Sequence, residues 1–392
     1  MRGQEALRVS LAGQDAAEAR QRAVNEQKFQ VKLGPVSLRV SASAGVEVTD
    51  NVRAVENNPQ ADLILRPRLD TFAVWRVTEK NSLTFGLGIG YLKYLHATDY
   101  DKFFISPGSD LSFDVYVKDF AINLHDRFAY TSDTTSDPTV SGRGSLTRIE
   151  NTLGVGVTWD LNEMVINAGY DHDILNTVNT IDRYLDRSSE LFTGGVGFKI
   201  NPLVLAGLEL GGGMTDFNED LQPDNSHISI GPYVKAELTE YTSLRASGGY
   251  VKYLIDTSGL TNVVSEKPAF YFSIALNQRL SQMLTHGLSA GRRLQGGIES
   301  NLMDMWYANY SASWLLLHQT TVGTTLSFEH VTEPNLQQTE TLNRYGFGLS
   351  FSRPITRKAV ASLSYQIYYK DSDIANRGYL QNRLVFELGY TF

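Results

Sequence analysis

A stretch near the start of the chain alternates strictly between apolar and polar side chains. In VSLRVSASAGVEVT (36–49), valine, leucine and alanine take the even positions, and polar residues or glycine take the odd ones. A period of two places the two sets on opposite faces of a β-strand. The run is more than twice as long as the usual strand of about five or six residues. This pattern predicts a long strand with one apolar face and one polar face that contacts water.

The same alternation recurs to the end of the chain, and it ends on an aromatic ring. The last segment, LVFELGYTF (384–392), keeps leucine, phenylalanine and tyrosine on one parity. We predict roughly eighteen strands, an even number, as in bacterial outer-membrane barrels. They are 36–49, 63–77, 83–91, 111–117, 120–130, 153–159, 164–170, 192–200, 204–212, 228–238, 244–250, 270–276, 284–290, 306–316, 320–330, 345–351, 359–369 and 380–392.

The connections between these segments alternate between short and long. Tight turns such as 118–119 and 201–202 follow every second segment, and long polar loops such as 131–144 and 176–189 follow the others. Short turns at one end and long loops at the other are typical of an antiparallel up-and-down membrane barrel. Closure leaves no sheet edge and satisfies every backbone group in lipid. A soluble sandwich would also alternate, but the strand lengths and the loop asymmetry disfavour it.

Composition excludes several other classes of protein. The chain has no cysteine, so it has no disulfide framework and no thiol ligands for a metal. Its net charge of −8 disfavours a nucleic-acid binder, which would carry a basic surface. No run of apolar residues is long enough for a membrane helix. The residues after Met1 lack the apolar core of a signal peptide, and we expect that such a segment has been removed.

Two regions are predicted: an N-terminal extension over 1–35 and the all-β transmembrane barrel over 36–392. Within the first, residues 4–28 are rich in alanine, glutamate, glutamine and arginine and predict a helix. This part is interpreted as a surface or partly disordered extension, a contact arm for a periplasmic export partner, or a plug that enters a pore. An even strand count places both ends of the barrel on the short-turn side, which is periplasmic in such proteins.

The polar parity is expected to line a water-filled lumen. It is rich in glycine and serine, and it carries more arginines than acids. Five arginines on strands near the closure could form a basic wall with a mild anion preference or a track for an acidic polymer. Alternatively, the charged side chains pair across strands and only brace the wall. The predicted pore-lining residues are Arg39, Glu47, Arg66, Arg68, Asp70, Arg76, Lys235, Arg245, Arg344, Arg383 and Glu387.

Two polar clusters resemble catalytic or metal-binding patterns only in part. The cluster DHD (171–173), at the start of a predicted outer loop, could activate water, but no second acidic pair accompanies it. The loop DFNEDLQPDN (216–225) spaces carboxylates like a calcium loop, yet Leu221 stands where such a loop needs glycine. We therefore predict no catalytic residue, no cofactor and no metal site. A loose divalent-ion contact between this loop and lipopolysaccharide remains an alternative.

Aromatic residues gather near several predicted strand ends. The segments GYLKYL (90–95), MWYANY (305–310) and YQIYYK (365–370) are examples. Amphipathic rings of this kind suit the two girdles of a membrane barrel, at the depth of the lipid headgroups. We expect these girdles to contact the bilayer, with lipopolysaccharide around the long-loop end.

The final strand resembles the insertion signal of Gram-negative outer-membrane barrels. The residues that match it are Leu384, Phe386, Leu388, Tyr390 and Phe392. This resemblance implies the outer membrane and the barrel-insertion machinery as a partner. A second segment, VEVTDNV (46–52) with ADLILRPRLDTFAVW (61–75), is similar to the opening hairpin of β-barrel porins from exopolysaccharide-export loci. That similarity implies a porin for hydrophilic solutes or for polysaccharide export; the alternative is an occluded structural barrel whose loops or N-terminal arm bind a partner.

Overall fold

A computed structural model describes residues 29–392, except 136, 257–265, 300, 317–318 and 334–338. The helix predicted over 4–28 lies outside the described residues. Within the described part of the chain, no helix has the length and apolar character needed to cross a membrane. The two helical segments described are short 3-10 turns, η2 (Thr98–Tyr100) and η3 (Thr180–Leu185).

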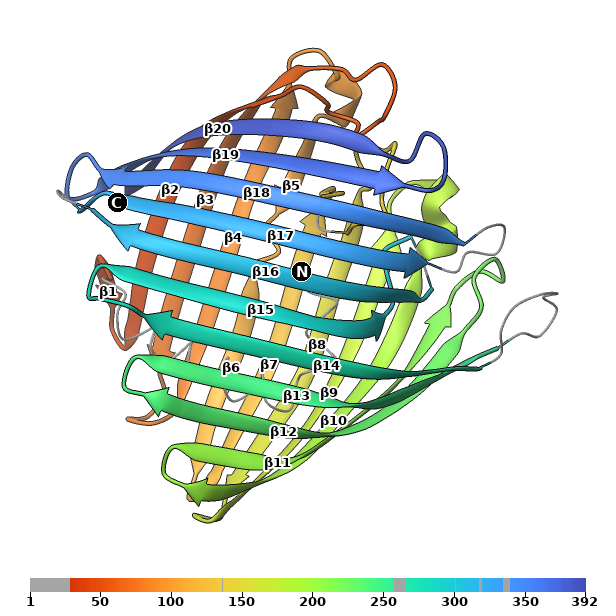
Figure 1. Ribbon diagram of the computed structural model, residues 1–392. Helices are drawn as coiled ribbons and strands as arrows, with labels where there is room; N and C mark the ends of the chain where they lie inside the picture. The colour runs from red at the N-terminus through yellow and green to blue at the C-terminus, as the bar shows by residue number, and fades with distance from the viewer. Residues whose placement is uncertain (1–28, 136, 257–265, 300, 317–318, 334–338) are drawn as a thin grey trace.

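Long antiparallel strands make up the described chain (Figure 1). In chain order they are β1 (Val31–Leu33), β2 (Val36–Thr49), β3 (Asp62–Arg76), β4 (Ser82–Tyr94), β5 (Lys102–Ile105), β6 (Asp110–Val117), β7 (Phe120–Thr131), β8 (Arg148–Asp160), β9 (Met164–Thr177), β10 (Arg187–Asn201), β11 (Val204–Phe217), β12 (Asn225–Thr239), β13 (Thr242–Ile255), β14 (Glu266–Arg279), β15 (Leu284–Gln295), β16 (Met303–Leu315), β17 (Thr321–Glu333), β18 (Glu340–Pro354), β19 (Ala359–Ser372) and β20 (Tyr379–Thr391).

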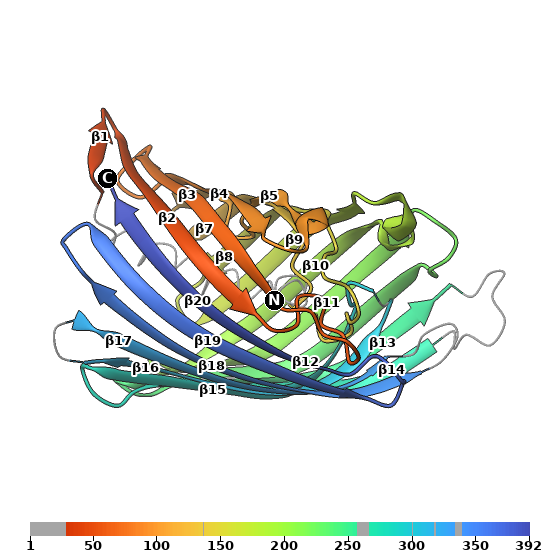
Figure 2. The same cartoon turned by 90° about the horizontal axis from the view of Figure 1, so that it is seen from above.

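The strands close into a barrel. Each pairs with its neighbours in sequence, and the first long strand, β2, pairs with the last, β20, over residues 41–49 and 383–391. Figure 2 shows these two strands side by side at the seam. Over the described residues this is a closed antiparallel barrel of eighteen strands, in which β5 and β6 together form the fourth. The predicted fold class is confirmed.

The fourth strand is interrupted, which the alternation pattern did not predict. Residues 106–109 leave the sheet between β5 and β6, although Ser106 N still donates to Gly88 O at 2.7 Å. Beside the break, the ring of Phe104 lies so close to Gly90 that a Cβ there would meet it at 2.4 Å. Glycine is therefore required at position 90. Only the second half of this strand, 111–117, was predicted from sequence.

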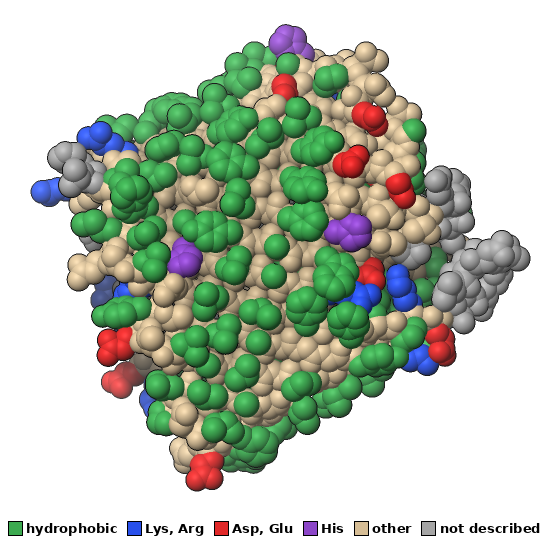
Figure 3. All heavy atoms as spheres, in the orientation of Figure 1, with side chains coloured by type: hydrophobic (Ala, Val, Ile, Leu, Met, Phe, Trp, Pro, Cys, Tyr) green, Lys and Arg blue, Asp and Glu red, His purple; other side chains and the backbone are tan. Residues whose placement is uncertain are grey.

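Most side chains on the outer face of the barrel are apolar, and most on the inner face are polar or small. Figure 3 shows hydrophobic side chains spread over β11–β20, with most charged ones toward the two ends. Leu384, Phe386 and Leu388 are each 45 % exposed on this face. Trp306, Tyr345 and other rings of the predicted girdles also point outward, but Tyr94, Tyr307 and Tyr368 take the inward parity; the first two are buried. The girdle prediction is wrong for these three rings.

The chain enters the barrel through a small hairpin. β1 pairs with the start of β2 across a turn at Gly34, whose φ of 60° suits glycine. It lies beside the part of β2 that extends beyond its pairing with β20 (Figure 2). The ring of Phe29 stacks at 6.2 Å on Phe72 of β3. Since Phe72 alternates with the outward Leu69 and Trp75, the described chain begins at the inner face, at the short-turn end.

Candidate functional site

The connection between β7 and β8, residues 132–147, folds into the barrel and is called the inner loop here. Thr139 is fully buried and Val140 is 2 % exposed. The carbonyl oxygen of Thr135 accepts a hydrogen bond of 2.9 Å from Arg344 Nη1 on β18. The carbonyl oxygen of Thr139 accepts a hydrogen bond of 2.7 Å from Nη2 of Arg377, which lies in the loop after β19. The inner loop therefore crosses the lumen from β7 and β8 to β18–β20.

Two other segments complete a layer with the inner loop. The backbone N–H of Ile298, in the loop after β15, donates to Asp137 Oδ2 at 2.5 Å. Arg143 of the inner loop forms ion pairs with Asp182 of η3 and, at 2.8 Å, with Glu299. The layer thus joins three long connections inside the long-loop half of the barrel. The sequence predicts long polar loops for two of these connections, 131–144 and 176–189, and does not reveal whether a loop folds inward; in the structure this layer lies inside the barrel.

Apolar side chains fill much of the inner wall beneath this layer. Met303, Met305, Val331 and Leu342 form one buried cluster with Tyr307. They come from the parity that was expected to be polar and wet. The expectation of a wholly polar lumen is therefore wrong near the long loops, because the layer covers the wall there and removes it from water.

A buried charge cluster ties the layer to β17–β19. The Glu340 carboxylate contacts Lys370 Nζ at 3.1 Å and Arg377 Nε at 2.7 Å. Lys370, only 1 % exposed, also donates to Thr139 O at 3.3 Å. Burial raises the pKa of the nearby Glu299 carboxyl, against the opposing effect of the arginines beside it. Removing one partner of such a cluster would leave a buried charge uncompensated.

A cavity of about 410 Å³ remains between the inner loop and the wall of β8–β13, and it is called the eyelet. Four carboxylates and two arginines line it, together with amide, hydroxyl and aromatic side chains. Arg148 pairs with Glu150 at 2.6 Å. The charged lining residues are Asp133, Asp137, Arg148, Glu150, Asp173 and Arg187.

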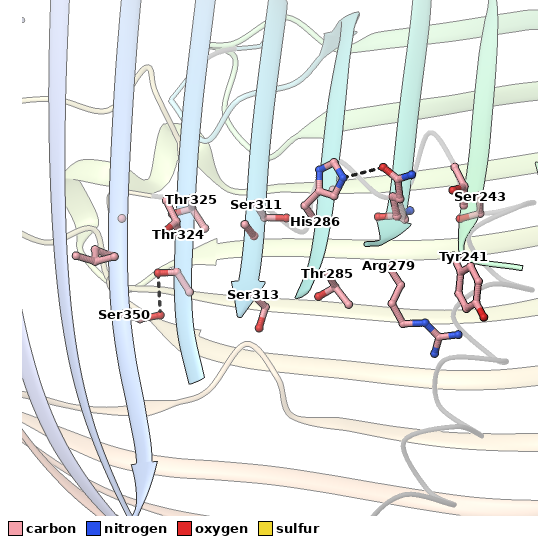
Figure 4. A pocket seen from close by; sticks show the side chains of 18 of the residues that line it. Tyr241, Ser243, Arg279, Thr285, His286, Ser311, Ser313, Thr324, Thr325 and Ser350 are labelled. Carbon is pink, nitrogen blue, oxygen red and sulfur yellow. Dashed lines mark hydrogen bonds between the residues drawn. The ribbon is translucent and has the colours of Figure 1, made fainter. Parts of the chain in front are cut away.

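One wall of the short-turn half of the lumen carries few charged side chains, namely Glu237, Glu240 and Arg279. A cavity of about 610 Å³, called the vestibule, follows the inner face of β13–β19. Figure 4 shows Ser243 of β13, Thr285 of β15, and Ser311 and Ser313 of β16 on this wall. At its mouth the guanidinium of Arg279 lies 4.9 Å from the Tyr241 ring centroid. The vestibule offers hydroxyls where the eyelet offers charges.

Many of the predicted pore-lining arginines lie on the inner face in ion pairs. Glu47, 3 % exposed, bridges Arg66 at 2.5 Å and Arg383 at 2.7 Å across the closure seam. Within β3, Arg68 pairs with Asp70 at 2.5 Å. Each of these cations therefore has a carboxylate against it, so the geometry matches the bracing alternative better than a free basic wall.

The remaining predicted residues are more scattered. Arg344 pairs with Glu329 at 2.6 Å and also holds the inner loop, a role that sequence reasoning missed. Arg39 and Arg76 lie in the short-turn half of β2 and β3. Lys235 and Arg245 face each other in register across β12 and β13, and Glu387 lies opposite Gly45 at the seam. Apart from the facing pair Lys235 and Arg245, the structure does not bring these last five together.

The structure shows where the two sequence clusters DHD (171–173) and DFNEDLQPDN (216–225) lie. Asp171 and Asp173 lie on the inner parity of β9, whereas His172 lies on the outer one with Glu190, 2.8 Å away. DHD thus belongs to a strand, not to the start of a loop, and its side chains diverge. In the second cluster, Asp224 Oδ1 accepts the Phe217 N–H at 2.7 Å. Within the described residues, no three His, Asp or Glu side chains are grouped to hold a metal ion.

Comparison with known proteins adds information on the fold. No protein-family model and no curated protein matches the chain. Among solved structures, Pseudomonas aeruginosa OccK2 (OpdF) is 11% identical with a TM-score of 0.51, over 93% of this chain and 100% of that chain. The structure of OccK2 (OpdF) in complex with glucuronate has a TM-score of 0.50 at 11% identity, over 93% of this chain and 100% of that chain. Acinetobacter baumannii OccAB3 is 9% identical with a TM-score of 0.49, over 91% and 99%. At these identities the similarity to outer-membrane porins shows the fold alone.

Proposed function

We propose that this chain is an outer-membrane channel through which small hydrophilic solutes diffuse without covalent chemistry. The observation that carries the proposal is the inner loop, which narrows the lumen yet leaves the eyelet beside it. A barrel of this strand number is wide enough for an aqueous channel unless something fills it. The apolar outer face supports a bilayer setting, with the short turns in the periplasm and lipopolysaccharide around the long loops. The last strand would carry the signal that insertion machinery recognises.

The size of the eyelet favours small solutes over polymers. Its volume of about 410 Å³ falls within the range of pockets that hold small molecules. A polysaccharide chain would need the whole inner-loop layer to move, against the ion pairs of Arg143, Glu299 and Glu340. None of the comparisons connects the chain with polysaccharide export. The glucuronate bound to OccK2 supports only the general idea of a small, hydrophilic cargo.

Ion selectivity is proposed to be weak, since the inner arginines are neutralised by acids. Changing Arg66 and Arg68 together to alanine leaves Glu47 with one partner and Asp70 with none of its present arginine contacts. We expect the reversal potential in a potassium chloride gradient to move toward that of potassium. An unchanged reversal potential would show that these residues lie off the ion path. Arg353→Ala, in an exposed part of the β18 end, is the control.

A second candidate is a structural barrel whose loops or N-terminal arm bind a partner. The position of Phe29 favours it, because this residue stacks on Phe72 at the inner face. The described chain therefore begins at the luminal mouth, which faces the periplasm in the proposed orientation. In this case the lumen would carry no current.

Planar-bilayer recording of the purified chain separates the two candidates. The channel proposal expects ohmic steps, in the full chain or after residues 1–28 are removed. Silence in both would contradict it. Steps that appear only in the shortened chain would show that the arm occludes an otherwise open channel.

A further inference from the structure

Gln295, the last residue of β15, lines the eyelet with an amide that has no partner. The residue is 2 % exposed. Neither Nε2 nor Oε1 forms a hydrogen bond with any described residue. A buried amide without partners is costly, and such groups are uncommon in native proteins. A polar side chain held this way at a cavity wall is a candidate contact for a ligand.

The inward turn of β15 places Gln295 at the eyelet. Pairing between β14 and β15 ends at Phe272 and Arg292, so the last three residues of β15 leave that neighbour. Leu294 then packs against Val251 and Ala269 instead of facing outward, and it is 1 % exposed. The strand end is held by specific packing, which fixes the position of the amide.

His227 and Tyr253 line the eyelet together with Gln295. The His227 ring stacks on Tyr253, with 4.8 Å between ring centroids, and Tyr253 Oη donates to Leu294 O at 3.4 Å. His227 Nε2 also has no hydrogen-bond partner among the described residues. His227 and Gln295 both line the eyelet, and their unpartnered polar atoms are almost fully shielded from water. His227, Tyr253 and Gln295 together form what we call the eyelet corner.

The charges of the eyelet disfavour an anionic ligand. Its lining holds four carboxylates against two arginines, and Arg148 is already paired with Glu150. Arg187 is also engaged, since it donates to Gly297 O at 2.8 Å and Ile298 O at 3.3 Å and lies over the Phe217 ring. An added carboxylate would meet surplus negative charge and no free arginine.

We propose that the eyelet corner binds uncharged, hydroxyl-rich solutes of the size of a sugar ring. The Gln295 amide can donate to one hydroxyl and accept from its neighbour, and His227 Nε2 can serve a third. This inference rests on the proposed channel function and names its cargo.

The test compares Gln295→Leu with the full-length chain in two assays. Leucine removes the unsatisfied amide, so we expect the variant to fold at least as well as the parent. Glucose should block the ionic current of the parent in a concentration-dependent way and bind it in detergent by calorimetry. In Gln295→Leu both effects should weaken about tenfold, as expected for loss of two hydrogen bonds to the solute.

Several controls keep the outcomes separable. Gln366→Leu makes the same change on β19, outside the eyelet, and should leave glucose binding unchanged. His227→Phe keeps the ring stacking and removes Nε2, which supplies a second variant should Gln295→Leu fail to fold. Stronger binding of glucuronate than of glucose, or equal binding by parent and variants, would overturn the inference. Calorimetric binding without any current would uphold it while refuting the channel.

Discussion

Removing residues 134–145 of the inner loop and joining β7 to β8 with a short glycine-serine linker should raise single-channel conductance at least about twofold. The inner loop contacts Arg344, Lys370 and Arg377 on the opposite wall, so its removal opens the cross-section that these contacts close. The strand pairing of β7 with β8 runs from Phe120 to Thr131 and does not depend on the loop. The measurement is the current step in a planar bilayer.

A loop deletion outside the lumen is the matched control. Residues 219–221 are exposed in the connection between β11 and β12 and do not line the eyelet. Their deletion should leave the current step unchanged. Equal conductance for the parent and the inner-loop deletion would show that the constriction lies elsewhere.

The second large effect is expected from Glu340→Ala in the buried charge cluster. This residue is 2 % exposed and neutralises both Lys370 and Arg377. Its loss leaves the buried Lys370 and the partly exposed Arg377 without their nearest carboxylate, and stranding a buried charge typically costs about 3–5 kcal/mol. The free energy of unfolding, followed in denaturant by the gel-mobility difference between folded and unfolded protein, should fall by that amount.

Two further variants show whether the effect comes from burial. Glu266→Ala breaks an exposed pair with Lys252, whose side chains are 55 % and 37 % exposed, and should cost less than about 1 kcal/mol. Adding Lys370→Met to Glu340→Ala should recover much of the lost stability, since it removes the buried ammonium group that Glu340→Ala leaves without its carboxylate partner. Similar losses for Glu340→Ala and Glu266→Ala would contradict the account of the cluster.

The barrel could be predicted from sequence because its signal is local. In strands such as β2 and β20, successive side chains point in turn to the outside and the inside of the barrel, and the period of two in the sequence records this directly. The interrupted fourth strand was only half predicted, since β5 is four residues long and is too short to show a pattern.

The constriction could not be predicted, because its contacts join distant parts of the chain. Arg344 and Thr135 are 209 residues apart, and Lys370 and Thr139 are 231 apart. The inner loop has a polar composition that also suits a solvated loop. One signal was available: apolar residues on the inward parity at Met303, Met305 and Leu342 indicate that something covers the wall there.

We expect the lumen to be wide at the short-turn end, because the inner loop crosses it only under the long loops. Polymer exclusion measures this directly: polyethylene glycols of increasing size are added to one side of a bilayer that holds the oriented channel. We expect polymers of intermediate size to lower conductance from the short-turn side, where they enter the vestibule, and to have less effect from the long-loop side. Equal effects from both sides, or no conductance to lower, would contradict the account.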